Sequence, residues 1–571
     1  MVDFIKTQNN FAHGEIDAEF FARDDIAGVA KLVNMDVVSG GGLTRRAGLK
    51  KVANLNGLAR IIPFSVSENE NYIIVIGNRY LDVLSTDGTR VQSLVSPWST
   101  ADTDKLQYAQ RFGTIIFVHP DYQPRVMSPK NNGGFELNIF GFSSNDDMSV
   151  NIPFMQFDDA LGITITVTSN AGGNNFATFT TNRNFWKPEC VGELLFLMNK
   201  QWEITSFVDA QTVVAHTNST YVVPANPITE WYEAAFSGYR GWPCSITFHQ
   251  DRLIFGGSRS YPSGIWMSQV GRHNNFSSGT GLDDEAIFIT LVSEQRQQIC
   301  TVVSSDNLQV LTSCGEWAIS NKPLTPSSVN VKQHTYVGSS VSRYLAPQKI
   351  EGQTVFVSGN LQDIRELSLD ELGEHYNAND LCAMSKHLMN TPIDIAYNSL
   401  EHKLFVVMDD GTMSVLNKNV NLRISAWGKY ETSGDFISVA VVDDITYVVV
   451  QHDNNFVLEK FDASALDDVG VVFDFCACGL PLRASNHNVS HLRVRKISVR
   501  LINTKSLCIN DKRVELPDEI YEPGADGFSG DVSMSGLGTT HDCINSPWKI
   551  HGMDALPATV LSISMYGNYG I

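Results

Sequence analysis

The chain has 571 residues, a formal net charge of −20 and a sequence pI of about 5.1. At about 150 residues per domain, this length predicts three or four units unless one large β-domain absorbs several of them. The acidic balance argues against a nucleic-acid coat or a binder of anionic membranes, because both need a basic face. No window approaches the roughly 18–20 uninterrupted apolar residues of a membrane helix.

The cysteines indicate a reduced, cytosolic protein, because their number is odd and no secretory leader precedes them. The sequence has nine of them, Cys190, Cys244, Cys300, Cys314, Cys382, Cys476, Cys478, Cys508 and Cys543.

The N-terminal segment, residues 1–55, differs in pattern from the rest of the chain. Apolar residues spaced along Asp24–Val38 (Ile26, Val29, Ala30 and Val33) predict a short helix. A triple glycine, 40–42, then precedes Arg45 and Arg46. It lacks both the Gly-Lys-Ser/Thr ending of a P-loop and the G-x-G-x-x-G pattern, so we expect a tight turn with basic residues for a partner rather than a nucleotide site.

A two-strand pattern repeats from about residue 59, and its clearest copy lies in 240–276, where one strand is expected over Ser245–Phe255 and a second over Gly264–Ser268. The first strands are expected at 72–76, 114–118, 252–255, 308–311, 354–357, 403–408 and 446–450. The second strands are expected at 80–84, 125–127, 265–267, 316–319, 364–367, 413–416 and 457–461. A recurrence of roughly 40–55 residues is typical of propeller blades, and seven copies predict six or seven blades. A pair of β-sandwiches is the alternative, since short strands separated by turns suit that fold as well.

The copies are interrupted between 141 and 235. Alternating strands at 162–168, 192–197, 202–205 and 212–215 predict an inserted β-barrel or sandwich of four or five strands, and Glu230–Ser237 a helical turn. The expected domains are 1–55, 56–140, 141–235, 236–469 and 470–571.

The last unit contains one strongly basic strand, His491–Leu501, in which the apolar positions change parity. A β-bulge near Lys496 would bring them onto one face. Strands at 506–510, 549–551 and 559–565 are expected to complete the same antiparallel sheet, with Gly524–Gly538 as a long mobile loop.

Candidate chemistry is weak throughout. Cys244 and His249 would point to opposite faces of a strand. Cys476 and Cys478 are separated by one residue and have no second pair at zinc spacing. His375, Asp380 and His387 could hold a metal, but a short surface helix explains them as well. Asp283–Glu285 could supply glycosidase carboxylates, but a solvated acidic loop is the simpler interpretation. We therefore assign no catalytic, metal or cofactor residue and expect no enzyme.

Taken in order, several motifs resemble the tail nozzle proteins, also called tail tubular protein B, of short-tailed phages. They include Gly-Glu-Ile at 14–16, the turn 40–48, His-Pro at 119–120, Gly-Trp-Pro at 241–243 and Gly-Glu-Trp at 315–317. The positions carrying this resemblance are Gly14, Glu15, Arg45, Arg46, Gly48, His119, Pro120, Gly241, Trp242, Pro243, Arg252, Gly256, Trp266, Trp317, Arg365, Glu366, Asp380 and His387.

The resemblance implies a virion structural protein with an all-β fold: a β-propeller-like core, an inserted small β-domain and a terminal β-sandwich platform. It implies a homo-hexameric nozzle below a tail adaptor (tail tubular protein A-like), assembled in the host bacterial cytoplasm. Phage DNA would pass through its lumen, and tail fibres or spikes are further candidate partners. The chain is compact beside longer nozzle proteins, so the resemblance does not identify the segment that forms the gate.

From these expectations we infer that 1–55 and 470–571 come together facing the adaptor, while 141–235 lines or closes the distal channel. The alternatives are a propeller that binds or hydrolyses glycans and a module that binds a host receptor.

Overall fold

The computed structural model describes residues 2–21, 23, 25–169, 175–277, 279, 281–370, 373–481, 491–522, 524–536 and 546–570. Within these ranges the regular structure is 48 strands and six short 3₁₀ helices, so the chain is all-β. No helix in this part of the chain is long and apolar enough to cross a bilayer.

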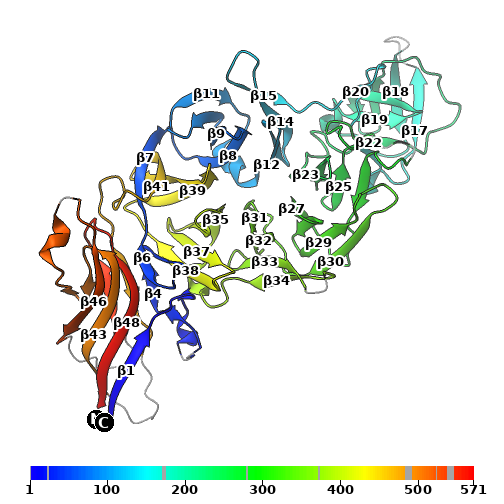
Figure 1. The fold of residues 1–571 in the computed structure, drawn as a ribbon. Coiled ribbons are helices and arrows are strands. Elements are labelled where there is room, and N and C mark those ends of the chain that lie inside the picture. Colours follow the sequence, from blue (N-terminus) through cyan, green and yellow to red (C-terminus); the bar gives the residue numbers. More distant parts are fainter. Residues whose placement is uncertain are drawn as a thin grey trace. The chain divides into compact units, whose positions relative to one another are not determined.

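Seven four-stranded antiparallel blades form a β-propeller-like core (Figure 1); six of them are separate sheets, and the sixth in chain order is part of an 11-stranded sheet. The first four blades are β8–β11 (Arg60–Ser67, Glu70–Gly77, Tyr80–Ser85, Arg90–Val95), β12–β15 (Gln107–Arg111, Thr114–His119, Tyr122–Pro129, Phe135–Ile139), β23–β26 (Ser245–His249, Arg252–Gly256, Gly264–Met267, Ile287–Thr290) and β27–β30 (Ile299–Ser304, Leu308–Thr312, Gly315–Ser320, Asn330–Thr335). Two more are β31–β34 (Gln348–Ile350, Gln353–Val357, Ile364–Leu369, Tyr376–Asp380) and β35–β38 (Pro392–Asn398, Lys403–Met408, Met413–Asn419, Ile424–Tyr430). The seventh contains β39–β41 (Asp435–Val442, Ile445–His452, Asn455–Asp462) and β7 (Gly48–Leu55).

Every copy of the predicted two-strand pattern falls on the second and third strands of a blade. These inner strands carry the longest buried apolar runs, as in β9 and β36. The outer strand β11 has no buried residue, which explains its weaker pattern in the sequence. One prediction at this level is wrong: Ser245–Phe255 is two strands, because Gln250 and Asp251 turn the chain with φ of 46° and 58°.

The seventh blade is completed by the N-terminal segment. β7 pairs antiparallel with β41, from Gly48 opposite Asp462 to Leu55 opposite Phe456. A strand that precedes the first blade thus closes the last one, and a buried apolar cluster that includes Leu49, Val415 and Val448 packs it against the sixth blade.

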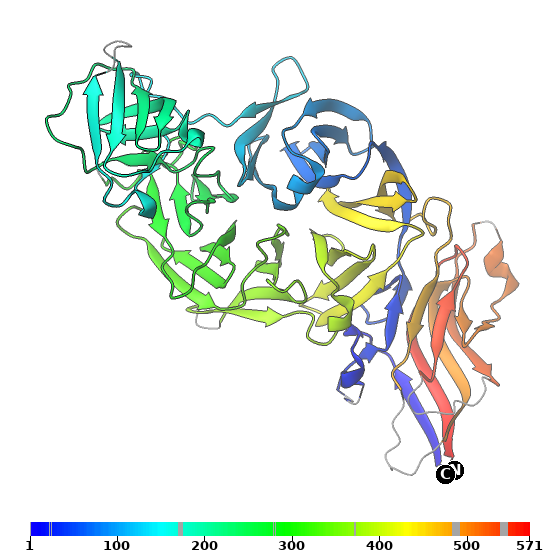
Figure 2. The ribbon, with the colours of Figure 1, turned by 180° about the vertical axis from the view of Figure 1, so that it is seen from behind.

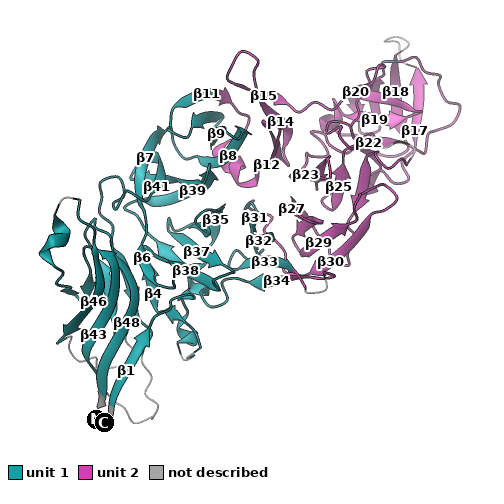
Figure 3. Ribbon diagram, viewed as in Figure 1, with its two compact units in different colours: residues 1–93, 345–368, 378–571 teal, residues 94–344, 369–377 magenta. Residues whose placement is uncertain are grey.

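The chain forms two compact units (Figure 3): residues 1–93, 345–368 and 378–571, and residues 94–344 and 369–377. The second unit contains the inserted domain, a seven-stranded sheet in the order β16-β22-β19-β20-β21-β18-β17. Its strands are Phe154–Met155 (β16), Ile165–Ser169 (β17), Phe176–Thr181 (β18), Leu194–Leu197 (β19), Lys200–Asp209 (β20), Thr212–His216 (β21) and Tyr232–Ala234 (β22). Three short helices lie in this unit, namely η2 (Thr100–Lys105), η3 (Asp158–Ala160) and η4 (Pro188–Cys190).

The insertion therefore has more strands than the four or five expected, and the helical turn predicted for Glu230–Ser237 is wrong. β22 in that stretch pairs with both β16 and β19. Its backbone groups are satisfied by the sheet, which overrides the local helical spacing.

The first unit contains a β-sandwich made from both chain ends. One sheet has the order β46-β43-β48-β6-β5, with β1 paired to β48. The other extends the sixth blade through β4, β42, β47, β44 and β45, with β2 and β3 alongside. The strands are Val2–Gln8 (β1), Gly14–Glu15 (β2), Gly28–Val29 (β3), Lys31–Val33 (β4), Met35–Val37 (β5), Leu43–Arg45 (β6), Phe475–Cys478 (β42), His491–Thr504 (β43), Cys508–Ile509 (β44), Lys512–Arg513 (β45), Phe528–Ser535 (β46), Lys549–Gly552 (β47) and Thr559–Gly570 (β48). The short helices here are η1 (Ala18–Phe20), η5 (Lys386–Leu388) and η6 (Asp518–Tyr521).

The apolar core of this terminal sandwich joins residues from the two chain ends, including Leu32, Phe475, Val499 and Ile563. The expected bulge is confirmed: the β43–β48 register shifts between Val494 and Lys496. The helix predicted for Asp24–Val38 is wrong, because β3, β4 and β5 occupy its described part, whereas Asp24 lies outside the described residues.

Two further C-terminal expectations need correction. Gly524–Gly538 is not simply a loop, since seven residues of β46, between Phe528 and Ser535, pair with β43. Positions 537 and 538 lie outside the described residues. The strands β44 and β47 belong to the sheet of β42 rather than to that of β43.

Candidate functional site: the junction of the chain ends

Both chain ends lie together in the terminal sandwich (Figures 1 and 2). β1 pairs with β48 from Val2 opposite Tyr569 to Gln8 opposite Ile563. This confirms that the N-terminal and C-terminal segments come together, as the sequence predicted.

The outer face of the terminal sandwich is basic along β43. Arg493, Arg495 and Arg500 are exposed there; Arg495 lies 3.7 Å from Asp3, and Arg500 is paired with Asp531. Val494 and Val499 of the same strand are buried. Guanidinium groups on an exposed sheet face are suited to contact an acidic protein surface, because they form bidentate bonds with carboxylates.

Arg46 connects the N-terminal segment to the C-terminal half of the chain. Its Nη1 and Nη2 donate to Oδ1 and Oδ2 of Asp468, at 2.9 and 2.6 Å, and both side chains are almost fully buried. Its Nε donates to Asn34 Oδ1 at 2.9 Å, and the guanidinium lies 3.7 Å from the centroid of the Phe473 ring. A buried charge needs this degree of compensation, so the position tolerates neither Lys nor a neutral residue without loss.

The neighbouring Arg45 binds the C-terminal segment through backbone oxygens. It donates to the carbonyls of Asp554, Leu466 and Phe473 and stacks on the Phe473 ring at 4.3 Å. The sequence suggested that this basic pair faces an external partner. The structure shows instead that both side chains are buried and hold the chain together.

Glu15 and His387 form the next connection. Glu15 accepts hydrogen bonds from the Leu32 N–H at 2.6 Å and pairs with His387 Nε2 at 2.8 Å. Asp17 pairs with the other ring nitrogen of His387. The hydrogen bond with Glu15 raises the pKa of His387. The N-terminal segment is thereby attached to the short helix η5 beside the sixth blade.

Two glycines allow the backbones to approach at this junction. Gly14 has φ of +63°, and a Cβ there would lie 2.3 Å from the Trp427 carbonyl oxygen. A Cβ on Gly48 would lie 2.1 Å from the carbonyl oxygen of Asp467. Both positions therefore require glycine.

A further buried network ties β5 to the sixth blade. Asp36 accepts hydrogen bonds from Tyr430 and from Lys403 Nζ, the latter at 3.0 Å. Burial lowers the pKa of Lys403, but Asp36, Tyr430 and Glu401 together outweigh this effect, so the pKa is raised. We refer to Arg46–Asp468, Glu15–His387 and Asp36–Lys403 together as the junction.

The positions of the second unit that carry the resemblance to nozzle proteins make contacts within its blades. Arg252 is fully buried and donates to the carbonyls of Ser268, Asp283 and Glu285. The remaining positions divide between backbone contacts and packing. The backbone N–H of Trp242, the residue before Pro243, donates to the Pro120 carbonyl, and Trp317 Nε1 donates to the Gln297 side chain. The ring of His119 contacts Tyr122 edge-on, and Trp266 stacks on Phe288. Gly241 lies close to Arg259, and Gly256 lies close to Val302.

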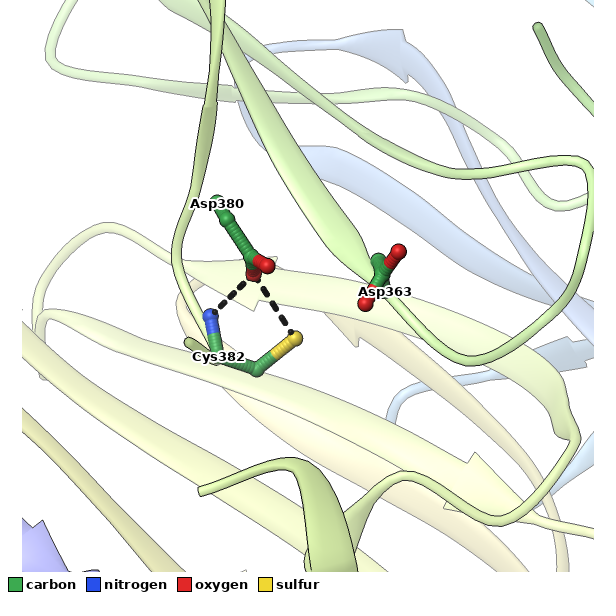
Figure 4. A group of neighbouring side chains, drawn as sticks. All are labelled: Asp363, Asp380 and Cys382. Carbon is green, nitrogen blue, oxygen red and sulfur yellow. Dashed lines mark hydrogen bonds between the residues drawn. The ribbon is translucent and has the colours of Figure 1, made fainter. Parts of the chain in front are cut away.

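Arg365, Glu366 and Asp380, which also carry the resemblance, lie on the fifth blade. They lie beside a group of side chains that could hold a metal. Asp363, Asp380 and Cys382 bring their ligand atoms within 4.8 Å of one another (Figure 4). Arg365 and Lys386 contact both carboxylates at 3.2–3.6 Å, so two cations already balance two anions. Burial raises the pKa of the Cys382 thiol to about 12, which disfavours the thiolate that a metal needs. We interpret this group as an ion-pair network. Glu366 pairs with Lys418 of the sixth blade.

The other candidates from the sequence remain without a chemical role. Cys244 and His249 do not pair: His249 contacts Ser304, and burial raises the pKa of Cys244 to about 12. Cys476 and Cys478 lie with their sulfurs 3.7 Å apart, but no third ligand joins them among the described residues.

The acidic loop Asp283–Glu285 and the two candidate metal ligands His375 and His387 make only structural contacts in the described part of the chain. Asp283 and Asp284 are exposed, and the Glu285 carboxylate accepts hydrogen bonds from two backbone N–H groups of its own turn. His375 contacts Lys332 at 3.4 Å, whereas His387 belongs to the junction.

Sequence reasoning missed a buried acidic pair in the second unit. Glu233 forms a bidentate pair with Arg240 at 2.7–2.8 Å, and Glu193 accepts a hydrogen bond from Ser237. Burial, reinforced by the charge of Glu233, raises the pKa of Glu193 well above its usual range. The available sequence signal was that Glu193 and Glu233 are each a single acid beside apolar residues. The sequence does not show that the two lie close together, because this depends on the pairing of β22 with β19.

No protein-family model matches the chain, and no curated protein matches it. Similar solved structures include the Pan2 WD40 domain of Neurospora crassa (8% identity, 73% of this chain, 95% of that chain, TM-score 0.32) and the C-terminal WD40 domain of Sif2 (11%, 73%, 99%, 0.34). BamB of Moraxella catarrhalis is also similar (10%, 73%, 98%, 0.32). The sheet topology, rather than these low scores, establishes the propeller-like fold.

Proposed function

We propose that the protein is a structural subunit of a phage tail nozzle, a homo-oligomeric ring that continues the DNA channel below a tail adaptor. In this role the terminal sandwich is the platform that contacts the adaptor. The ring retains the packaged genome and lets it pass during ejection.

One observation carries this proposal. The N-terminal positions that resemble nozzle proteins, Gly14, Glu15, Arg45, Arg46 and Gly48, all make buried contacts or close backbone approaches at the junction. Residues shared by chance would be scattered over the surface without a common task. Their convergence supports a resemblance that extends to the architecture joining platform and propeller.

The edges of the terminal sandwich suit assembly into a ring. β46 is one end of its sheet, and β1 pairs on one side with β48. Among the described residues, no further strand covers the outer side of either, so backbone groups are available to another chain. Two different open edges on one subunit support heterologous, head-to-tail contacts, which close into rings when the rotation allows.

The charge of the chain suits a channel through which DNA moves. A net charge of −20 repels phosphates and disfavours retention of DNA by the wall. Arg493 and Arg495 of β43 supply a local, exposed positive charge that is suited to protein docking.

The test is binding to the tail adaptor encoded with this protein. Arg493→Glu combined with Arg495→Glu reverses two exposed charges on the platform and should weaken binding by at least about tenfold. Lys130→Glu combined with Arg272→Glu makes the same charge change at exposed positions of the second unit and serves as the control. Equal binding by both double variants, or no binding by the unmodified protein, would refute the proposed docking surface.

A further inference from the structure

A cavity of about 580 Å³ lies in the second unit, where the inserted sheet meets the third blade. Strands β16, β19 and β22 supply one wall, and β25 and β26 supply another. Its size is typical of a pocket for a small molecule or a few sugar units.

Aromatic rings line both walls, and the strand register explains why. Phe196 is paired with Tyr232, and Phe154 is paired with Ala234, so the three aromatic side chains share one face of the inserted sheet. Phe154 and Phe196 have ring centroids 5.6 Å apart. On the blade, Trp266 stacks on Phe288 at 5.4 Å.

Two of these rings are incompletely covered, with Tyr232 39% exposed and Phe288 47% exposed. The nearby rings Trp266 and Phe276 are buried and support the blade wall from within. Exposed aromatic rings on a preformed wall are ready to stack against a flat apolar face.

Planar amides complete the lining. Asn145 and Asn151 hydrogen-bond to each other, and Gln201 holds the Val150 backbone through both its oxygen and its nitrogen. These bonds fix the wall in place. Asn199 and Asn218 are exposed and have no side-chain partner in the described part of the chain, so their donors and acceptors are available.

The charges in the lining cancel. Asp147 is the one carboxylate and Lys200 the one ammonium among the described residues that form it. Asp147 is bonded to Ser149, and Lys200 to Ser219. A nucleic-acid strand also stacks on aromatic rings, but it requires a basic groove, which this lining lacks.

We propose that this cavity binds a neutral oligosaccharide. The C–H faces of the sugar rings would stack on Tyr232 and Phe288, and hydroxyl groups would exchange hydrogen bonds with Asn199 and Asn218. Hydrolysis by paired acids needs two carboxylates, and the lining offers one, so the site binds rather than cleaves. The proposal holds whether or not the chain forms a nozzle.

The full-length protein would be titrated with maltohexaose, cellohexaose and chitohexaose, following tryptophan fluorescence because Trp266 lies in the lining. A hyaluronan hexasaccharide and a hexathymidine oligonucleotide provide anionic comparisons. We expect saturable binding of at least one neutral sugar below about 1 mM and weaker binding of both anions. Saturation by no neutral sugar up to about 20 mM, or tighter binding of either anion, would overturn the proposal.

The variants Tyr232→Ala, Phe288→Ala and Asn218→Ala change exposed positions, so the fold should persist. Each aromatic variant should weaken binding by about tenfold. The control is Tyr336→Ala, which removes a 79% exposed ring of the same unit outside the cavity and should leave affinity unchanged. Binding that survives both aromatic substitutions would place the sugar elsewhere and contradict the assignment.

Discussion

Replacing Arg46 by Met should loosen β4–β6 in the terminal sandwich while leaving β7 and the other blade strands folded. The substitution removes a bidentate partner from the buried Asp468 and also removes one of the two donors to Asn34 Oδ1, leaving only the Glu431 N–H. Breaking one side of a buried ion pair costs about 3–5 kcal/mol, because the remaining charge stays desolvated. At about 1.4 kcal/mol per tenfold, 4 kcal/mol corresponds to roughly a thousandfold larger opening equilibrium.

The same protein offers a control of matched geometry. Arg500 binds Asp531 with two bonds of 2.8 Å, but the two side chains are 60% and 59% exposed. Arg500→Met should therefore have no measurable effect on stability, since water screens and replaces the pair.

Hydrogen exchange followed by mass spectrometry measures this difference locally, which matters because a multidomain chain does not unfold in two states. Peptides covering 31–37 and 473–478 should exchange about a thousandfold faster in Arg46→Met. Adding Asp468→Leu should restore much of the protection, because it removes the orphaned charge. Equal exchange in Arg46→Met and Arg500→Met would refute the reasoning.

Three further outcomes are expected. Gly14→Ala should detach the N-terminal segment from the sixth blade, raising its protease sensitivity, while Gly40→Ala, whose Cβ meets nothing within 4 Å, should not. Because the pKa of buried Glu193 is raised above its unfolded value, its stabilising contribution is full at low pH and is lost as pH rises through the raised pKa. The melting temperature of the second unit should thus fall as the pH rises above the ordinary carboxyl pKa of 4.5, with a shallower slope in Glu193→Gln; an unchanged slope would contradict this. Deleting 160–231 removes the core of the inserted domain as a unit and should leave soluble blades. Deleting 141–235 also removes Phe157 from the core around Phe255 and should cause aggregation, which light scattering would detect.

The propeller was predictable because its inner strands are uninterrupted apolar runs followed by turns, as in Lys403–Met408 and Asp410-Gly411. The bulge near Lys496 was predictable for a similar reason, since an extra residue in a strand is what shifts its apolar positions from one parity to the other. Both features are local, and both are visible in a short window of sequence.

The predictions that failed concern residues whose partners lie far away in the sequence. The spacing of Val29 and Val33 fits a helix, but partners hundreds of residues away, such as Cys476 opposite Val33, make this segment a strand. Arg46 looked like a surface residue because nothing near it in sequence shows that Asp468 will pair with it. The cavity aromatics were hidden for the same reason, because Tyr232 and Phe288 come from different sheets.

The most direct test of the nozzle proposal is the mass and symmetry of the full-length protein mixed with its tail adaptor, by light scattering and negative-stain microscopy. We predict a closed ring of six copies bound to the adaptor through the terminal sandwich, with Arg493→Glu/Arg495→Glu failing to join it. A chain that remains monomeric in the presence of the adaptor would contradict the account.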